Sequence, residues 1–439
     1  MGIDSQRLDA LTVEAYASKE TKFAFRRRTF SFALSHGLFS AAGIDTGSRL
    51  LLKILSKTID EDREQGVPPP RNALDAGCGV GVLGICAAAV LDSCCVRCQD
   101  RDELARAFTL RNAHTNRVPP DRLSAHTEPL LACPPDARWD LILSNLPAKA
   151  GEPVLEDFAR RSAALLSPGG RALVVIVHTL RERFRAWLSQ AGAPVLREER
   201  GTEHTVFMYG PASDRIERLV PPDAAYHRLS GVYEIEGVSY RLDSIHGVRD
   251  FDTPHGTVRV AAKLIARGGN RFPGTWGSVL IHEPGQGHFP VWLVERLASR
   301  SETLPQRIVF SGRNILALEI ARHNTERSSR SAVRVEIVPL ADLVIGRDLV
   351  ARPGGYDLIA AFPEPVPQVT RPLWEGIAPL ASPGGIAILS LAAGDAARFD
   401  RTTCAPLVRL SDIKLKGFRA FARSSPPAAG GTARPPVAW

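Results

Sequence analysis

The chain has 439 residues, of which 44% are hydrophobic and 23% are charged. That length allows two or three domains with cores of their own, and the composition excludes a disordered or fibrous chain. No apolar run is long enough to span a bilayer, and the first ten residues lack the basic and apolar regions of a secretory signal. We therefore expect a cytoplasmic protein with no membrane contact.

The charge and the cysteines say less about partners. A formal net charge of +8 favours polyanionic partners, RNA first. Arginine greatly outnumbers lysine, which often reflects coding bias, so charge alone leaves an RNA partner open. Cys94, Cys95 and Cys98 lie in an apolar strand pattern, and no second cysteine or histidine pair follows at zinc spacing. We interpret them as buried free thiols and expect no metal.

The first fifty residues contain two features of interest. Residues 22–30 alternate aromatic and basic side chains, which predicts an edge strand with one solvated face and a secondary RNA contact through its arginines. Residues 35–55 form a glycine-rich loop followed by a helix from about Gly47, with Asp45 or Thr46 as its N-cap. We expect this loop to act as a lid over a cofactor.

The central motif of the chain is ALDAGCGVGVLGICA, residues 73–87. An apolar strand ends at Asp75, turns through Gly77, Gly79 and Gly81, and enters an apolar helix. Such a turn brings backbone amides close to a ligand. The string from Gly79 to Gly84 fits a dinucleotide turn, and the string from Asp75 to Gly81 fits a turn for S-adenosylmethionine (SAM), so the glycines alone leave both cofactors open.

Strand and helix patterns alternate after this motif. The strands are predicted over CCVRCQ, a short stretch before Glu128, WDLILSN and RALVVIVH, and the helices over DELARAFTLRNAHTN, VLEDFARRSAALL and LRERFRAWLSQAG. Alternation of this kind predicts an α/β fold with a parallel, doubly wound sheet. Two further strands, around PVLREER and HTVFMYG, have no helix between them and are predicted to close the sheet as an antiparallel hairpin.

This order of motifs resembles the class I SAM-dependent methyltransferases, and within them the small-domain subfamily that includes bacterial rRNA guanine-N2 methyltransferases. The resemblance covers about the first half of the chain and rests on GLFSAAGIDTGSRLLLKIL, LDAGCGVGVLGICAA, Asp100 at the end of a strand, DLILSNLPAKAG, LLSPGGRALVVI and HTVFMYG. It implies a Rossmann-like fold, an enzyme, SAM as cofactor and ribosomal RNA as substrate.

The resemblance implies a cofactor site formed by Asp75, Gly77, Gly79, Asp100, Arg101 and Glu128. Asp75 would hold amides of the turn and the amino group of the methionine moiety. Asp100 ends the next strand, where a carboxylate can accept from both ribose hydroxyls. Arg101 would flank the adenine, and Glu128 would accept from the adenine amino group, with a solvated loop acid as the alternative for Glu128.

The same resemblance places the methyl acceptor at Asn145, Leu146 and Pro147. An exocyclic or amide nitrogen is a poor nucleophile, and two carbonyl groups that accept its N–H bonds would orient its lone pair. Asn145 would supply one carbonyl and Leu146 the other, held by the stiffness of Pro147. Relatives usually have proline in place of Leu146 and an aromatic or bulky apolar residue in place of Ala148. An aromatic there would stack on a flipped base, so its absence weakens the case for a nucleobase substrate.

The second half of the chain repeats the motifs of the first half but lacks several of its candidate site residues. His36, Gly37 and Lys53 have counterparts at equal spacing in His246, Gly247 and Lys263. Aligned by motif, the second half has Glu283 for Asp75, Gly285 for Gly77, Gly287 for Gly79, Phe289 for Gly81, Gly312 for Asp100 and Phe362 for Asn145. We therefore expect a degenerate copy that binds no SAM.

These patterns predict a methyltransferase domain over residues 1–212, a degenerate copy over 213–423 and a disordered tail over 424–439. The favoured function is methylation of an exocyclic nitrogen of rRNA by the first domain, with the second domain orienting the RNA, in a monomer. In the relatives the degenerate copy comes first, so here the order is reversed. The alternatives are a protein amide or small-molecule acceptor, and a non-catalytic binding scaffold.

Overall fold

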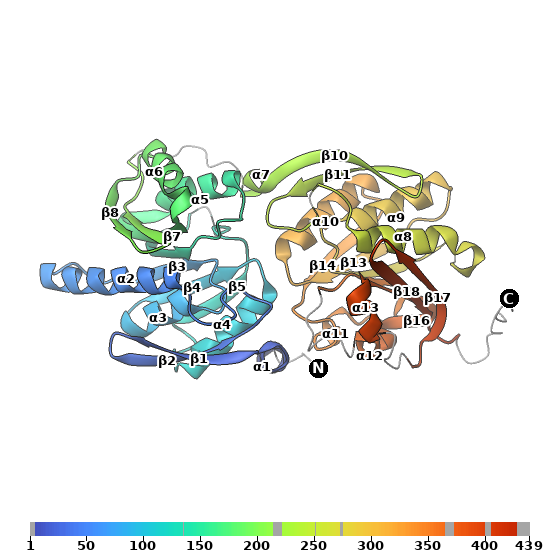
Figure 1. Cartoon of the computed structure of the whole chain (residues 1–439), viewed down its shortest axis with the longest axis horizontal. Coiled ribbons are helices and arrows are strands. Elements are labelled where there is room, and N and C mark those ends of the chain that lie inside the picture. The colour runs from blue at the N-terminus through green and yellow to red at the C-terminus, as the bar shows by residue number, and fades with distance from the viewer. Residues whose placement is uncertain are drawn as a thin grey trace. The chain divides into compact units, whose positions relative to one another are not determined.

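The computed structural model describes residues 5–134, 136–213, 222–250, 252–272, 275–364, 373–399 and 405–427. The chain divides into two compact units, an N-terminal unit that runs from Ser5 to His227 and a C-terminal unit that begins at Arg228 (Figure 1). Residues 214–221, which follow the boundary predicted from sequence, lie outside the described residues. So does most of the predicted tail, from 428 to 439.

The N-terminal unit alternates strands and helices as the sequence predicts. Its helices are α1 (Ser5–Tyr16), α2 (Thr46–Gln65), α3 (Val82–Val90), α4 (Glu103–Thr115), α5 (Glu152–Ala164), η1 (His178–Leu180), α6 (Arg181–Gln190) and α7 (Pro222–Tyr226). Its strands are β1 (Lys19–Phe25), β2 (Arg28–Leu34), β3 (Asn72–Ala76), β4 (Cys95–Asp100), β5 (Leu123–Thr127), β6 (Trp139–Asn145), β7 (Leu166–Val177), β8 (Val195–Arg200) and β9 (His204–Tyr209).

Seven of these strands form one sheet in the order β5-β4-β3-β6-β7-β9-β8. The first five strands of this order are parallel, whereas β9 pairs antiparallel with both β7 and β8. The predicted doubly wound sheet and its closing hairpin are therefore confirmed. Because the parallel strands end at one edge, the residues that follow β3, β4, β5 and β6 meet there.

Burial of both sheet faces explains the near-continuous apolar character of the central strands. Leu74, Ile142 and Val174 are fully buried and pack with Phe158 of α5 and Phe184 of α6 on one face. The apolar face of α2 runs along β7 and β9. Within the described residues, no helix combines the length and the apolar character needed to cross a membrane.

The prediction of a single edge strand over residues 22–30 is wrong. This segment is a hairpin of β1 and β2, which form a separate two-stranded sheet. Arg26 and Arg27 occupy its turn with φ angles of 44° and 61°. Arg26 is held by Asp60 of α2 at 2.7 Å, so this arginine serves a local contact. The sequence signal missed the turn because neither residue is a glycine or an asparagine.

One buried amide ties this hairpin to the rest of the unit. Asn112 of α4 accepts from the Ala33 amide at 2.8 Å and donates to the carbonyl groups of Ala33 and Val80 at 3.1 and 2.9 Å. Val80 lies in the glycine turn, so the same side chain connects β2, α4 and the predicted cofactor loop.

The C-terminal unit repeats this architecture. Its helices are α8 (Gly256–Arg267), η2 (Gly269–Arg271), α9 (His288–Ser299), α10 (Ile315–Ser328), α11 (Arg347–Val350), α12 (Leu373–Ile377), η3 (Ala378–Leu380) and α13 (Ala393–Phe399). Its strands are β10 (His227–Ile235), β11 (Val238–Ile245), β12 (Ser278–His282), β13 (Arg307–Gly312), β14 (Arg334–Pro339), β15 (Tyr356–Ala361), β16 (Ala381–Ala392), β17 (Val408–Leu415) and β18 (Phe418–Ser424). The order β14-β13-β12-β15-β16-β18-β17 matches the first sheet strand for strand.

The repeat extends to single hydrogen bonds. Asn324 of α10 accepts from the Asp243 amide at 2.9 Å and donates to the carbonyl groups of Asp243 and Gln286 at 2.8 and 2.9 Å, as Asn112 does in the first unit. Asn324 is fully buried, like Asn112. The predicted tandem copy is thereby confirmed at the level of the fold.

Replacing Asn112 by alanine is expected to destabilise the N-terminal unit by about 3 kcal/mol, because two carbonyl groups and one amide would lose their buried partner. Urea unfolding of the full chain measures this as a shift of one transition. Thr115→Ala is the control, since the Thr115 hydroxyl is exposed and bonds only its own helix. Equal shifts for the two variants would contradict the role given to Asn112.

Candidate functional site

The glycine turn between β3 and α3 has the geometry of a ligand cradle. Gly77, Gly79 and Gly81 have φ angles of 78°, 56° and 86°, a region that side chains rarely adopt. A Cβ on Gly77 would stand 3.3 Å from the Leu130 side chain, whereas a Cβ on Gly79 would meet no atom within 4 Å. The backbone at Gly79 therefore faces open space that a ligand can enter.

Asp100 fixes the conformation of this turn. Its carboxylate accepts from the Gly79 amide at 3.0 Å and from the Asp102 amide at 3.1 Å. Burial, with the nearby Asp102 charge adding to it, raises the pKa of Asp100 to about 6. The carboxylate thus lies beside the cradle with its geometry already set by the backbone.

Asp75 lies beneath the turn and has a polar atom without a partner. Its Oδ2 accepts from the Gly84 amide of α3 at 2.7 Å, while its Oδ1 is buried and has no hydrogen bond. Burial raises the pKa of Asp75 to about 7, and the Asp100 charge acts in the same direction. An unpaired buried carboxylate oxygen is expensive, and an ammonium group of a ligand would satisfy it.

These observations fit SAM, whose amino group and ribose hydroxyls need such acceptors. Asp75 has a free oxygen for the amino group, Gly79 leaves room for the ligand, and the carboxylate of Asp100 lies at the end of β4, beside the turn. When bound, the cofactor supplies an electrophilic methyl group on sulfur. The residues of this chain hold and orient it.

Arg101 and Glu128 are the other two residues of the predicted cofactor site. Arg101 is exposed at the start of the segment that leads to α4. The Glu128 amide donates to the Asp100 carbonyl at 2.8 Å, which places Glu128 beside the cradle. Its carboxylate is paired with Arg97 at 2.6 Å. The adenine contacts predicted for Arg101 and Glu128 stay predictions.

Sequence reasoning missed Gln99, a fully buried side chain in β4. The main-chain carbonyl of Gln99 accepts from the amides of Gly77 and Cys78 at 2.9 and 3.1 Å. Its side-chain amide donates to the carbonyl groups of Pro129, at 3.2 Å, and Leu130. Gln99 therefore holds the segment after β5 against the turn, and nothing in the local sequence sets it apart from Arg97 and Asp100, the other polar residues of β4.

Asn145 ends β6 at the same edge of the sheet, and its orientation is fixed. Its Nδ2 donates to Asp45 Oδ1 at 2.9 Å and to Ser48 Oγ at 3.1 Å. A carboxylate only accepts, so the amide nitrogen must face Asp45 and the amide oxygen must face away. Asp45 is also the N-cap of α2, as predicted, and accepts from the Ser48 amide at 2.8 Å.

The two residues after Asn145 form a short turn. The Leu146 amide donates to the Val175 carbonyl of β7 at 3.0 Å, and the Leu146 side chain is buried. The Pro147 carbonyl accepts from the Ala150 amide at 3.0 Å, while Pro147 and Ala148 are exposed. Sequence reasoning missed Asp45 and Ser48 as parts of this site, because they lie in the helix cap that it treated as a lid.

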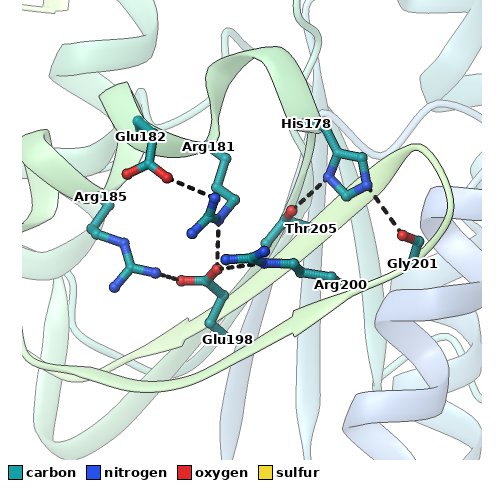
Figure 2. A network of polar contacts seen from close by, with 8 residues as sticks. All are labelled: His178, Arg181, Glu182, Arg185, Glu198, Arg200, Gly201 and Thr205. Atoms are coloured by element: carbon teal, nitrogen blue, oxygen red, sulfur yellow. Dashed lines mark hydrogen bonds and ion pairs between the residues drawn. The ribbon is translucent and has the colours of Figure 1, made fainter.

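A polar network lies next to this site, beyond the end of β7 (Figure 2). His178 hydrogen-bonds with the Thr205 hydroxyl at 2.9 Å and the Gly201 carbonyl at 3.1 Å. Three arginines converge on the Glu198 carboxylate, Arg181 at 2.7 Å, Arg200 at 3.4 Å and Arg185. We call Arg181, Arg185 and Arg200 the arginine group. Arg181 also pairs with Glu182 at 2.6 Å, so two carboxylates face three guanidinium groups, and Arg200 remains 60% exposed.

In the C-terminal unit, side chains fill the place that corresponds to the candidate cofactor site. The left-handed cap of the helix is Gly81 in α3 and Gly287 in α9, with φ angles of 86° and 91°. This equivalence corrects the motif alignment by two residues: Glu283 corresponds to Gly77, Gly285 to Gly79, Gly287 to Gly81 and Phe289 to Leu83. The prediction that Phe289 occupies a turn glycine is wrong.

The corrected alignment explains how the second site is closed. The strand registers keep Gly312 at the place of Asp100 and Phe362 at the place of Asn145. The Glu283 carboxylate lies over Gly312, and a Cβ added to Gly312 would stand about 3.1 Å from it. The same carboxylate accepts from the Arg313 amide at 2.9 Å. The rings of Phe289 and Phe362 pack against each other in a tilted arrangement, with 5.0 Å between centroids and 57° between planes.

Comparison with known proteins shows what the first unit is similar to. Residues 29–191 match the family model of the methyltransferase small domain. The chain is 28% identical over 162 residues to the uncharacterized protein YbxB of Bacillus subtilis, covering 36% of this chain and 75% of that protein. It is 30% identical over 142 residues to the ribosomal RNA large subunit methyltransferase G of Photobacterium profundum, covering 31% of this chain and 36% of that protein.

A ribosomal protein L11 methyltransferase of Parasynechococcus marenigrum is 38% identical over 132 residues, 29% of this chain and 40% of that protein. The match thus spans well under half of the two curated methyltransferases. Among solved structures, the T. thermophilus 16S rRNA N2 G1207 methyltransferase in complex with AdoMet and guanosine has a TM-score of 0.63 at 17% identity. It covers 94% of this chain and 99% of that chain, so the likeness of fold includes both units.

The full chain is expected to bind one SAM, in the N-terminal unit. Asp100→Ala should weaken that binding by about 2–4 kcal/mol, because two ribose hydroxyls would lose a charged acceptor. Titration calorimetry gives both the stoichiometry and the affinity, with Asp92→Ala as the control, because Asp92 is exposed and follows the C-terminal end of α3, away from the turn. Two SAM molecules per chain would show that the second site is open.

SAM affinity is expected to fall as pH is lowered from about 8 to about 5. The raised pKa values, about 7 for Asp75 and about 6 for Asp100, mean that both acids take up protons in this range, and a neutral Asp75 attracts an ammonium group less. In Asp75→Asn, which can still accept from Gly84, the affinity should be lower and should decline only near pH 6. A profile that is flat between pH 8 and 6 in the unaltered chain would exclude Asp75 from the amino-group site.

Proposed function

From the match of residues 29–191 to the methyltransferase small domain, a fold that uses SAM, we propose that this chain methylates an exocyclic nitrogen of ribosomal RNA, with guanine N2 as the target. The observation that carries the proposal is the fixed orientation of Asn145. Its amide nitrogen donates to Asp45 and Ser48, which leaves its carbonyl oxygen to bind the nitrogen that accepts the methyl group.

An exocyclic amine needs help because its lone pair is delocalised into the ring. The carbonyl groups of Asn145 and Leu146 would accept its two N–H bonds and align the lone pair with the methyl group. As the new N–C bond forms, the C–S bond breaks, and one amine proton passes to water. Pro147 would hold the Leu146 carbonyl in place.

The proposed cofactor roles follow the geometry. Asp75 Oδ1 takes the amino group of the methionine moiety, the backbone at Gly77 and Gly79 lines its path, and Asp100 accepts from the ribose. Arg101 and Glu128 lie at the adenine end. None of these contacts requires a metal, and the described residues include no group of three or more His, Cys, Asp or Glu side chains that could hold one.

Two basic surfaces support an RNA substrate. The arginine group lies beyond β7, at the same edge of the sheet as Asn145, and its three guanidinium groups outnumber the carboxylates of Glu182 and Glu198 that pair with them. The C-terminal unit has a shallow groove of about 420 Å³ lined in part by Arg241, Arg327 and Arg330. Phosphates would bind both through counterion release. We propose that the C-terminal unit orients the RNA and that the protein acts as a cytoplasmic monomer.

A protein nitrogen is the second candidate acceptor. It is favoured by the absence of an aromatic residue at Ala148 and by the similarity to the L11 methyltransferase. Mass spectrometry separates the two: RNA nucleosides and ribosomal proteins from cells lacking this gene are compared with those of the parent strain. Loss of an N2-methylguanine supports the proposal, whereas loss of a methyl group from a protein, with RNA unchanged, overturns it.

Asn145→Ala is expected to lower methyl transfer by about 10²–10³ in kcat and to leave SAM affinity nearly intact. The reason is that this side chain acts on the acceptor and not on the cofactor. Turnover with labelled SAM and ribosomal subunits from the deletion strain measures the first quantity, and calorimetry the second. Lys149→Ala, an exposed change in the same loop, should have normal turnover. Normal turnover of Asn145→Ala would reduce this residue to a turn cap.

A further inference from the structure

The loop between β2 and α2 presents one large apolar side chain to solvent. Phe39 is 72% exposed, more than any other large hydrophobic side chain among the described residues. A single exposed apolar side chain is common on protein surfaces, so the exposure of Phe39 gains meaning only from its place in the fold.

Hydrogen bonds connect this loop to the acceptor site. The hydroxyl group of Ser40, the next residue, donates to Asp45 Oδ2 at 3.2 Å. The other oxygen of the same carboxylate accepts from Asn145. Phe39 is therefore next to a residue that is only two hydrogen bonds away from the proposed catalytic amide.

The internal repeat shows where a side chain at this position can reach. Ser40 and Asp250 have nearly the same left-handed φ, 64° and 65°, and both stand five residues before a helix N-cap, Asp45 and His255, so Phe39 corresponds to Arg249. The guanidinium of Arg249 donates to the Phe362 carbonyl at 2.7 Å. Phe362 corresponds to Asn145. In the second unit, then, the side chain at this loop position extends to the acceptor position.

Building on the proposed RNA methylation, we infer that Phe39 is the aromatic platform on which the target base stacks while Asn145 and Leu146 bind its exocyclic nitrogen. A flipped base needs a ring to replace its stacking partners in RNA. Ala148 cannot supply that ring, and in this proposal Phe39 supplies it from a different loop. The exposure of Phe39 is then the exposure of a binding surface that the base covers.

Phe39→Ala is expected to lower kcat/KM for ribosomal subunits from the deletion strain by about 10- to 100-fold, the range for one lost base–aromatic stack. Phe39→Trp should keep near-normal activity, and Phe39→Leu, apolar but not aromatic, should resemble Phe39→Ala. SAM affinity should stay unchanged in all three. The control is Leu196→Ala, which removes a side chain 52% exposed on β8. Leu196 lies away from the edge of the sheet that carries Asn145. Its neighbour Val195 is level with Tyr209 and Ala172, whereas Asn145 is level with Val175, nearer the end of β7.

A direct measurement uses the added indole of Phe39→Trp as a probe. Its emission should be quenched by guanosine 5′-monophosphate in the presence of SAM, and the emission of Leu196→Trp should not. Normal kcat/KM in Phe39→Ala, with wild-type RNA methylation intact, would overturn the stacking role and leave the proposed function standing. Absence of RNA methylation by the unaltered chain, with SAM bound, would instead overturn the proposed function itself, and the role of Phe39 with it.

Discussion

The Asp45 carboxylate joins two parts of the N-terminal unit that are a hundred residues apart in the chain. One oxygen caps α2 through the Ser48 amide and holds the Asn145 side-chain amide, and the other accepts from Ser40. Helix start, acceptor residue and the loop that presents Phe39 thus share one anion. Because a carboxylate can only accept hydrogen bonds, this contact determines which atom of Asn145 is left for a substrate.

The two units show how one scaffold can keep its fold and lose its site. Asn112 and Asn324 make the same three buried hydrogen bonds, since without them the hairpin and the turn would have unsatisfied backbone groups. The residues that face the ligand were free to change. In the second unit the Glu283 side chain lies over Gly312, and the ring of Phe362 replaces an amide.

Local pattern was enough to predict most of the fold. The alternation of strand and helix signals, the closing hairpin, the glycine turn and the Asp45 cap all depend on residues close together in the chain, where period and capping chemistry act directly. The same holds for the place of Asp100 and Asn145 at the ends of their strands, because parallel strands end at one edge of a sheet. The existence of a tandem copy also followed from the order of its motifs.

Only the tertiary structure decided what depends on contacts between distant segments. The register of the second glycine turn shifted by two residues, since a short motif with two glycines aligns equally well either way until the helix cap at Gly287 fixes it. The turn at Arg26 and Arg27 escaped detection because their left-handed backbone has no sequence signal. The role of Gln99 and the pairing of Asp45 with Asn145 join residues far apart in the chain. The sequence by itself thus determined the fold class and the residues at the strand ends, and the tertiary structure decided their partners, because hydrogen-bond partners depend on packing in space and not on spacing along the chain.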